Sequence, residues 1–151
     1  MITPQQFHQL LPLAVKWAEQ QEIYILRNGV SLTDAQIRDA RLVPVVSPEK
    51  VRLLRVTQVP SPMDPILKSA SQDVNLITPN TIGLTLQYGI FVREDYWGNR
   101  GLIIHELVHV AQYERLGGIP GFLNQYLQEC IKFGYPQAPM EQEAINYSRS
   151  F

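Results

Sequence analysis

The chain has 151 residues, with 13 basic and 14 acidic side chains and a formal net charge of −1. This length predicts a single domain, residues 1–151, that buries a core without the help of disulfides. A charge so close to zero provides no global field for nucleic acid or for an anionic membrane surface, and we expect neither as a partner. No apolar run approaches the roughly 18 to 20 residues of a membrane span, and no signal peptide is recognisable. We therefore expect a cytoplasmic location.

The N-terminal region is expected to contain two helices. Thr3 and Pro4 form an N-terminal cap for an amphipathic helix whose apolar positions recur to Ala18, with Pro12 as its weak point. A short second helix is predicted over residues 31–41.

The middle of the chain reads as β-structure. Residues 42–48 and 60–65 are proline-rich connections, and they enclose a strand over residues 51–59, which is rich in β-branched side chains. Residues 73–95 are predicted to form two or three further strands. Because these strands precede most of the helices without βαβ alternation, we expect an α+β fold.

Three helices are predicted in the C-terminal part. The first runs from about Arg100 to the stop signal at Gly117, and the others span residues 120–133 and 139–148. Cys130, the single cysteine, lies on the apolar face of the second of these helices. We expect it to be a packed core thiol.

Residues 105–109 read His-Glu-Leu-Val-His in the first of these three helices. Side chains four residues apart lie on one helix face, so His105 and His109 are placed to bind one Zn²⁺, with Glu106 next to the metal's water. Gln112 extends this polar stripe on a helix that is otherwise apolar, and buried polar groups need partners. With 3 histidines and 14 acidic residues in the chain, such spacing arises by chance in about half a percent of sequences of this composition. The motif therefore predicts a zinc site.

Catalytic zinc requires a third protein ligand and an open position for water. No histidine follows the motif, and His8 is expected to have a packing or surface role. Glu114 points away from the metal, because five residues past the second histidine correspond to about 140° around the helix. Glu129, Glu141 and Glu143 remain as candidates. The last two lie in the first turn of a helix, where the helix dipole also favours a carboxylate.

The pairing of His-Glu-Leu-Val-His-Val-Ala-Gln at residues 105–112 with Glu-Gln-Glu-Ala at residues 141–144 resembles the small gluzincin-type zinc peptidases, including the compact minigluzincins. The resemblance covers the chain from about Tyr88 onward. It implies a zincin-like fold, in which a small antiparallel or mixed sheet packs on the central motif helix, with further C-terminal helices. It also implies Glu141 as the third ligand, the first glutamate of a Glu-x-x-Ala-Asp segment. Here Ile145 replaces the acidic residue, so the group that would hold a zinc ligand from that position is missing.

These residues predict a zinc-dependent hydrolase, a peptidase acting on a peptide or protein substrate. Zinc lowers the pKa of its bound water and polarises the carbonyl, and Glu106 would be the general base. The resemblance implies a sheet-edge strand that pairs with the substrate, for which residues 88–94 are the candidate, a core strand being the alternative. Candidates for stabilising the oxyanion are Tyr135, Tyr147 and Arg149. Gln112 either touches a ligand or substrate or hydrogen-bonds across the helix interface.

Two other functions fit the same residues. One is a catalytically silent zinc-binding domain with a structural or interaction role in a larger assembly, and the other is a metal hydrolase acting on a non-peptide amide. Glu106 favours catalysis over the silent domain, because a purely structural zinc site has no need of a base.

Overall fold

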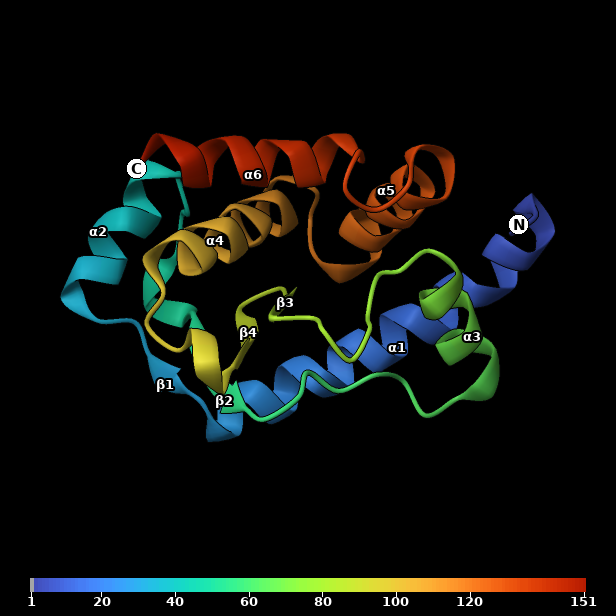
Figure 1. The fold of residues 1–151 in the computed structure, drawn as a ribbon, viewed down its shortest axis with the longest axis horizontal. Helices are drawn as coiled ribbons and strands as arrows, with labels where there is room; N and C mark the ends of the chain where they lie inside the picture. Colours follow the sequence, from blue (N-terminus) through green and yellow to red (C-terminus); the bar gives the residue numbers. More distant parts are fainter. Residues whose placement is uncertain (1) are drawn as a thin grey trace.

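The computed structural model describes residues 2–151, and in this part of the chain six α-helices surround a four-stranded mixed sheet (Figure 1). The fold is α+β, as predicted. Within residues 2–151, no helix is long and apolar enough to cross a membrane. In chain order the elements are α1 (Pro4–Asn28), β1 (Val30–Ser31), α2 (Asp34–Leu42), the 3-10 helix η1 (Pro48–Lys50), β2 (Arg52–Val56), α3 (Pro65–Asp73), β3 (Gly83–Leu86), β4 (Gly89–Arg93), the 3-10 helix η2 (Glu94–Tyr96), α4 (Arg100–Arg115), α5 (Ile119–Phe133) and α6 (Pro139–Ser150).

The strand order in the sheet is β1-β2-β4-β3. β2 is antiparallel to β1 and parallel to β4, and β3 pairs with β4 as an antiparallel hairpin. The hairpin turn is Gln87 and Tyr88, and Gln87 has a φ of 60°. Glu22 of α1 fixes this turn, because its carboxylate accepts hydrogen bonds from Gln87 Nε2 and from the Tyr88 amide.

The sheet order corrects one expectation. Residues 88–94, predicted as an edge strand for substrate, form β4, which lies between β2 and β3 and has four buried residues out of five. The alternative of a core strand is therefore right. The expectation failed because strand order cannot be read from chain order. β3 precedes β4 in the chain but pairs on its outer side, so β4 lies inside the sheet. The sheet edge nearest α4 is β3.

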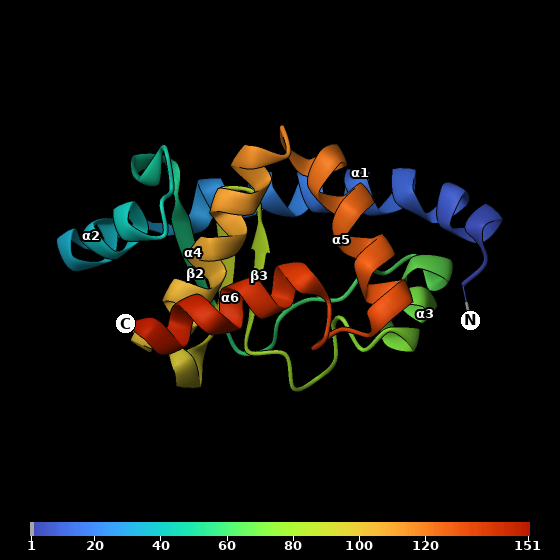
Figure 2. The ribbon, with the colours of Figure 1, turned by 90° about the horizontal axis from the view of Figure 1, so that it is seen from above.

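The sheet lies between helices. α1 runs along one side of it, while α4, with α6 across it, lies on the other (Figures 1 and 2). α1 and β4 approach closely at Gly89, where an added Cβ would lie 2.9 Å from Ile25 Cβ. α5 contacts both α1 and α4. These contacts bury α4 along most of its length.

Local signals explain most helix boundaries. The predicted boundaries of α4, α5 and α6 agree with the structure to within two residues. α1 continues through Pro12 as far as Asn28. α3 was not predicted, although Asp64 caps it by accepting hydrogen bonds from the amides of Ile66 and Leu67 and Pro65 occupies its first turn. Of the two or three strands expected in residues 73–95, two form, β3 and β4.

Candidate metal centre

α4 places the polar stripe of the motif at the centre of the molecule. Its N-terminus is capped by Asn99, whose side chain accepts a hydrogen bond from the Leu102 amide at 2.9 Å. Glu106, His109 and Gln112 are buried, with exposed fractions of 5%, 6% and 0%. His105 is partly exposed. The stripe is therefore buried apart from one imidazole, which lies where solvent or a ligand has access.

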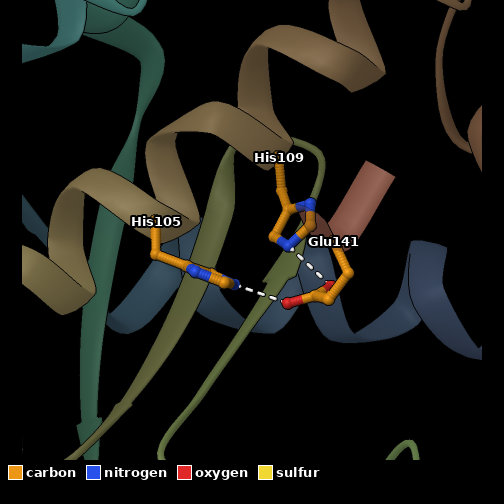
Figure 3. Close-up of side chains that lie close together, drawn as sticks. All are labelled: His105, His109 and Glu141. Carbon is orange, nitrogen blue, oxygen red and sulfur yellow. Dashed lines mark hydrogen bonds and ion pairs between the residues drawn. The ribbon is translucent and has the colours of Figure 1, made fainter. Parts of the chain in front are cut away.

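Three side chains predicted as zinc ligands lie together. His105 and His109 project from α4 toward Glu141, which lies in the first turn of α6 (Figure 3). His105 Nε2 is 2.6 Å from Glu141 Oε1, and His109 Nε2 is 3.1 Å from Glu141 Oε2. One nitrogen of each imidazole and one carboxylate oxygen all lie within 4.8 Å of one another. The crossing of α6 over α4 thus brings the three groups to one point.

This donor set fits zinc. Imidazole nitrogen and carboxylate oxygen are zinc ligands with bond lengths of about 2.0–2.2 Å, which places the ligands of a tetrahedral ion roughly 3.4 Å apart. The three groups need only small shifts to satisfy that geometry. Two histidines and one glutamate also form a ligand set of catalytic zinc, which leaves a fourth position for water.

The charges of the three groups are strongly coupled. Burial alone would lower the pKa of His109, but its hydrogen bond to Glu141 and the charges of Glu141 and Glu106 raise that pKa to about 9. Burial alone would raise the pKa of Glu141, yet the hydrogen bonds and positive charge of the two histidines hold it well below the ordinary value. A buried carboxylate that stays ionised provides the negative charge that a dication requires.

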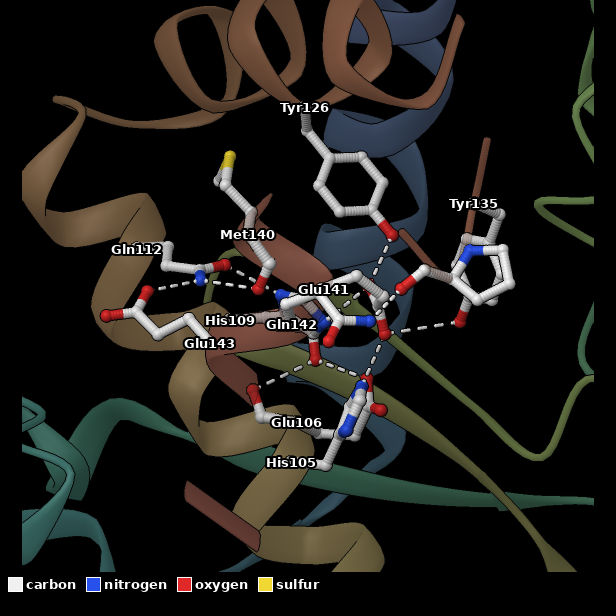
Figure 4. A network of polar contacts seen from close by, with 12 residues as sticks. His105, Glu106, His109, Gln112, Tyr126, Tyr135, Met140, Glu141, Gln142 and Glu143 are labelled. Atoms are coloured by element: carbon white, nitrogen blue, oxygen red, sulfur yellow. Dashed lines mark hydrogen bonds and ion pairs between the residues drawn. The ribbon is translucent and has the colours of Figure 1, made fainter. Parts of the chain in front are cut away.

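Gln112 fixes the orientation of His109 (Figure 4). The Gln112 amide nitrogen donates to the Met140 carbonyl at 2.9 Å and to Glu143 Oε1 at 2.6 Å, both of which only accept. Gln112 Oε1 therefore faces His109 Nδ1, 2.7 Å away, and must accept a hydrogen bond from it. In the neutral imidazole this leaves the lone pair on Nε2, the nitrogen that points at Glu141. Gln112 was expected either to touch a ligand or substrate or to hydrogen-bond across the helix interface. The structure shows the hydrogen bonds to α6, and Gln112 also contacts His109, a candidate zinc ligand.

Two tyrosines hold the carboxylate of Glu141. The Tyr126 hydroxyl donates to Oε2 at 2.7 Å, and the Tyr135 hydroxyl is 3.4 Å from Oε1. Of the three residues considered for the oxyanion, Tyr135 is thus at the site. Tyr147 instead packs against the apolar cluster around α4, and Arg149 is exposed.

The other candidate carboxylates have different partners. Glu129 Oε1 accepts a hydrogen bond from the Met140 amide at 2.8 Å and so caps α6. Glu143 binds Gln112 and Arg115. Glu114 points away from the site as predicted, and it accepts hydrogen bonds from the amides of residues 46 and 47 and from the Tyr88 hydroxyl.

Two further residues that the sequence singled out do not belong to the cluster of candidate ligands. His8 is exposed on α1. Cys130 is buried as predicted, and burial raises its pKa to about 12, which makes it a poor nucleophile.

Glu106 is held by the edge strand. The Thr85 hydroxyl donates to Glu106 Oε1 at 2.8 Å and lies 3.2 Å from the Glu106 carbonyl. Thr85 is itself fixed, because the Tyr113 hydroxyl donates to its carbonyl at 3.1 Å. Close by, Gly83 approaches so nearly that an added Cβ would lie 3.2 Å from Glu106 Cδ. The backbone of β3 therefore runs directly beside this carboxylate.

Sequence reasoning missed Thr85 and Tyr126. Tyr126 shares the apolar face of α5 with Cys130 and received no role, although a buried tyrosine hydroxyl needs a hydrogen-bond partner and so indicates a polar contact. For Thr85 the sequence contains no comparable signal, because its role depends on which strand lies beside α4.

Two cavities reach the site from different sides. One is lined mainly by apolar side chains and extends between α1, α3 and α5 to Glu106 and His109. The other is more polar and extends from the start of α4 to His105 and Glu106. Glu106, Gly83 and Tyr135 line both. Comparisons of the chain with family models, curated proteins and solved structures find no match.

Proposed function

We propose that this protein is a zinc-dependent hydrolase of zincin-like fold and gluzincin type, which cleaves peptide bonds in a peptide or protein substrate. The observation that carries the proposal is the convergence of two imidazole Nε2 atoms and one buried carboxylate at a point beside Glu106. His105, His109 and Glu141 would hold the metal. Access from two cavities supports catalysis rather than a closed structural site.

The residues around the metal position divide the chemical work. When bound, zinc supplies a Lewis acid that lowers the pKa of water towards about 7 and polarises the carbonyl of the substrate. Glu106 accepts the proton of the attacking water and passes it to the leaving amine. Thr85 keeps the Glu106 carboxylate in place through its hydrogen bond. Tyr135 is the candidate hydrogen-bond donor to the oxyanion, since its hydroxyl lies near the Glu141 carboxylate.

β3 is the candidate strand for binding the substrate backbone. It forms the edge of the sheet and contacts α4. The Arg93 amide donates to the Ile82 carbonyl, so residue 82 faces β4. Because orientation alternates along a strand, the backbone groups of Gly83 face outward from the sheet. An extended peptide added at Gly83 would place its backbone next to Glu106.

Metal binding is tested by elemental analysis and zinc titration of the purified chain. We expect about one zinc per chain and its loss in the His105→Ala, His109→Ala double variant. Near-stoichiometric zinc that persists in this double variant would refute the site.

The third ligand is tested by zinc titration of single variants. We expect Glu141→Ala to weaken zinc affinity by more than the 10–100-fold that is typical when a residue supporting a ligand is changed. Glu129→Ala is the matched control, for which we expect nearly unchanged affinity. Glu143→Ala should weaken the affinity far less than Glu141→Ala, because Glu143 reaches His109 only through Gln112. Release of zinc by Glu129→Ala alone would assign the ligand to α5 instead.

Catalysis is tested with Glu106→Gln in a peptide-library cleavage assay. We expect this variant to keep its fold and its zinc but to lose nearly all hydrolysis, because the amide cannot accept the proton of water. Glu94→Gln, an exposed position, is the control. Cleavage by Glu106→Gln at the wild-type rate would refute the role of Glu106. Stoichiometric zinc without any hydrolysis in the wild type would favour the silent zinc-binding domain.

A further inference from the structure

An apolar cavity of about 110 Å³ reaches the candidate base. Its walls come from α1, α3, β3, α4 and α5. Residues that line it outside the metal centre include Trp17 of α1, Leu67 and Ala70 of α3, and Leu123 of α5. Glu106, His109 and Thr85 line it as well. An apolar group that fills the cavity is therefore next to the reacting atoms.

The position of β3 relates this cavity to a bound peptide. Leu84 and Leu86 line the cavity together with Gly83 and Thr85, so the whole edge strand borders it. Side chains of an extended peptide alternate between the two faces of its strand. A peptide paired with β3 therefore directs one side chain beside the scissile bond into this cavity.

From this arrangement we propose that the cavity is a specificity pocket, which receives one large aliphatic side chain of the substrate next to the bond that is cleaved. The inference rests on the proposed hydrolase function. Its substrates are then peptides with leucine or methionine at this position. Aspartate, glutamate and lysine are excluded there, because a charged side chain would be desolvated against apolar walls without a partner.

The size of the cavity supports this class of side chain. An enclosed apolar cavity of about 150 Å³ holds a benzene molecule. A cavity of about 110 Å³ matches an isobutyl or thioether side chain and brings phenylalanine to the limit of the available space. Removing most of such a side chain from the substrate is expected to cost at least about tenfold in kcat/KM.

The proposal is tested by changing the volume of the pocket in the zinc-loaded chain. Ala70→Phe fills the space from α3, and Leu67→Ala enlarges it, while both positions lie outside the metal centre. Ala35→Phe, on the exposed face of α2, is the matched control. The substrates are two peptides that differ only in leucine or alanine beside the scissile bond, and a third peptide with phenylalanine there is added for Leu67→Ala.

We expect the wild type to prefer leucine over alanine by at least about tenfold. Ala70→Phe should remove this preference, and Ala35→Phe should leave it unchanged. Leu67→Ala should also cleave the phenylalanine peptide in preference to the alanine peptide. A wild type that cleaves both peptides equally, or an Ala70→Phe variant with the wild-type preference, would refute the pocket. In either case the hydrolase proposal would remain.

A second measurement does not depend on turnover or on zinc. Trp17 lines the cavity and reports on its contents by fluorescence in a Trp97→Phe background, where it is the only tryptophan left. N-acetyl-leucine amide should change this fluorescence in a saturable way, and N-acetyl-alanine amide should not. Adding Ala70→Phe should abolish the response. Equal responses to both amides, or a response that survives Ala70→Phe, would refute the pocket even if no peptide is hydrolysed.

Discussion

Replacing Gln112 by methionine tests whether this glutamine holds a zinc ligand in place. The side chain is fully buried and makes three polar contacts, with His109 Nδ1, the Met140 carbonyl and Glu143. Methionine has similar volume and an unbranched stem but lacks the amide, so the substitution keeps the packing and removes all three contacts. At about 1 kcal/mol per hydrogen bond, the free energy of unfolding without zinc should fall by about 3 kcal/mol.

Zinc binding should respond separately from stability. Loss of the acceptor at Nδ1 frees the His109 ring to rotate and to place its hydrogen on either nitrogen, and such changes typically weaken metal affinity by about 10–100-fold. Competition with a chelator measures this affinity, and Gln128→Met, on the exposed face of α5, is the control. Affinity within about twofold of wild type, alongside the loss of stability, would show that Gln112 only joins α4 to α6 and would refute the reasoning.

Three further predictions concern other contacts around the site. Gly83→Ala should lower kcat by about tenfold without loss of zinc, because the added Cβ would lie 3.2 Å from Glu106 Cδ and would push that carboxylate aside. Steady-state kinetics and zinc analysis of the variant measure the two quantities. Burial raises the pKa of Glu22 above its ordinary 4.5 despite the hydrogen bonds it accepts, so its stabilising contribution is lost as pH rises through the raised pKa. Chemical denaturation should therefore show Glu22→Gln gaining stability relative to wild type from below pH 4.5 to neutral pH; a constant difference would contradict the assignment. Glu129→Ala removes the acceptor for the Met140 amide and should cost about 1 kcal/mol in unfolding free energy, whereas Glu129→Gln should retain most of it.

The sequence predicted what lies within one helix better than what lies between elements. His105 and His109 share a face of α4 because of their spacing, and the apolar residues around them required burial of that face. The shared face follows from residue spacing and the burial from apolar composition, and both can be read within one helix. The boundaries of α4 were also predictable, since the asparagine cap and the two glycines act within a few residues.

The choice among the downstream carboxylates depended on how α5 and α6 pack, which no local pattern encodes. Glu129 and Glu141 were both compatible with a chain that folds back to the histidines. In the structure α5 places Glu129 at the start of α6, where it binds the Met140 amide, and only Glu141 faces the two imidazoles. The edge strand was missed for the same reason. The parallel pairing of β2 with β4 leaves β3 outside, and strand order is a property of the whole sheet.

Ile145 departs from the expected sequence pattern, and the tertiary structure supplies a different acceptor for His109. The gluzincin-type pattern inferred from the sequence would have an acidic residue there to hold a ligand, and an isoleucine cannot accept a hydrogen bond from an imidazole. In this chain the acceptor for His109 is Gln112, three residues along the same helix, with Glu143 of α6 behind it. A carboxylate therefore still lies behind the imidazole, but it acts through an amide instead of touching the ring. An amide carries no charge, so His109 should be a weaker electron donor than an imidazole bound directly to a carboxylate. On this reasoning Nδ1 of His109 needs no acidic residue at position 145, because Gln112 already accepts its hydrogen bond. Ile145→Asp should therefore leave zinc affinity nearly unchanged when it is measured by competition with a chelator.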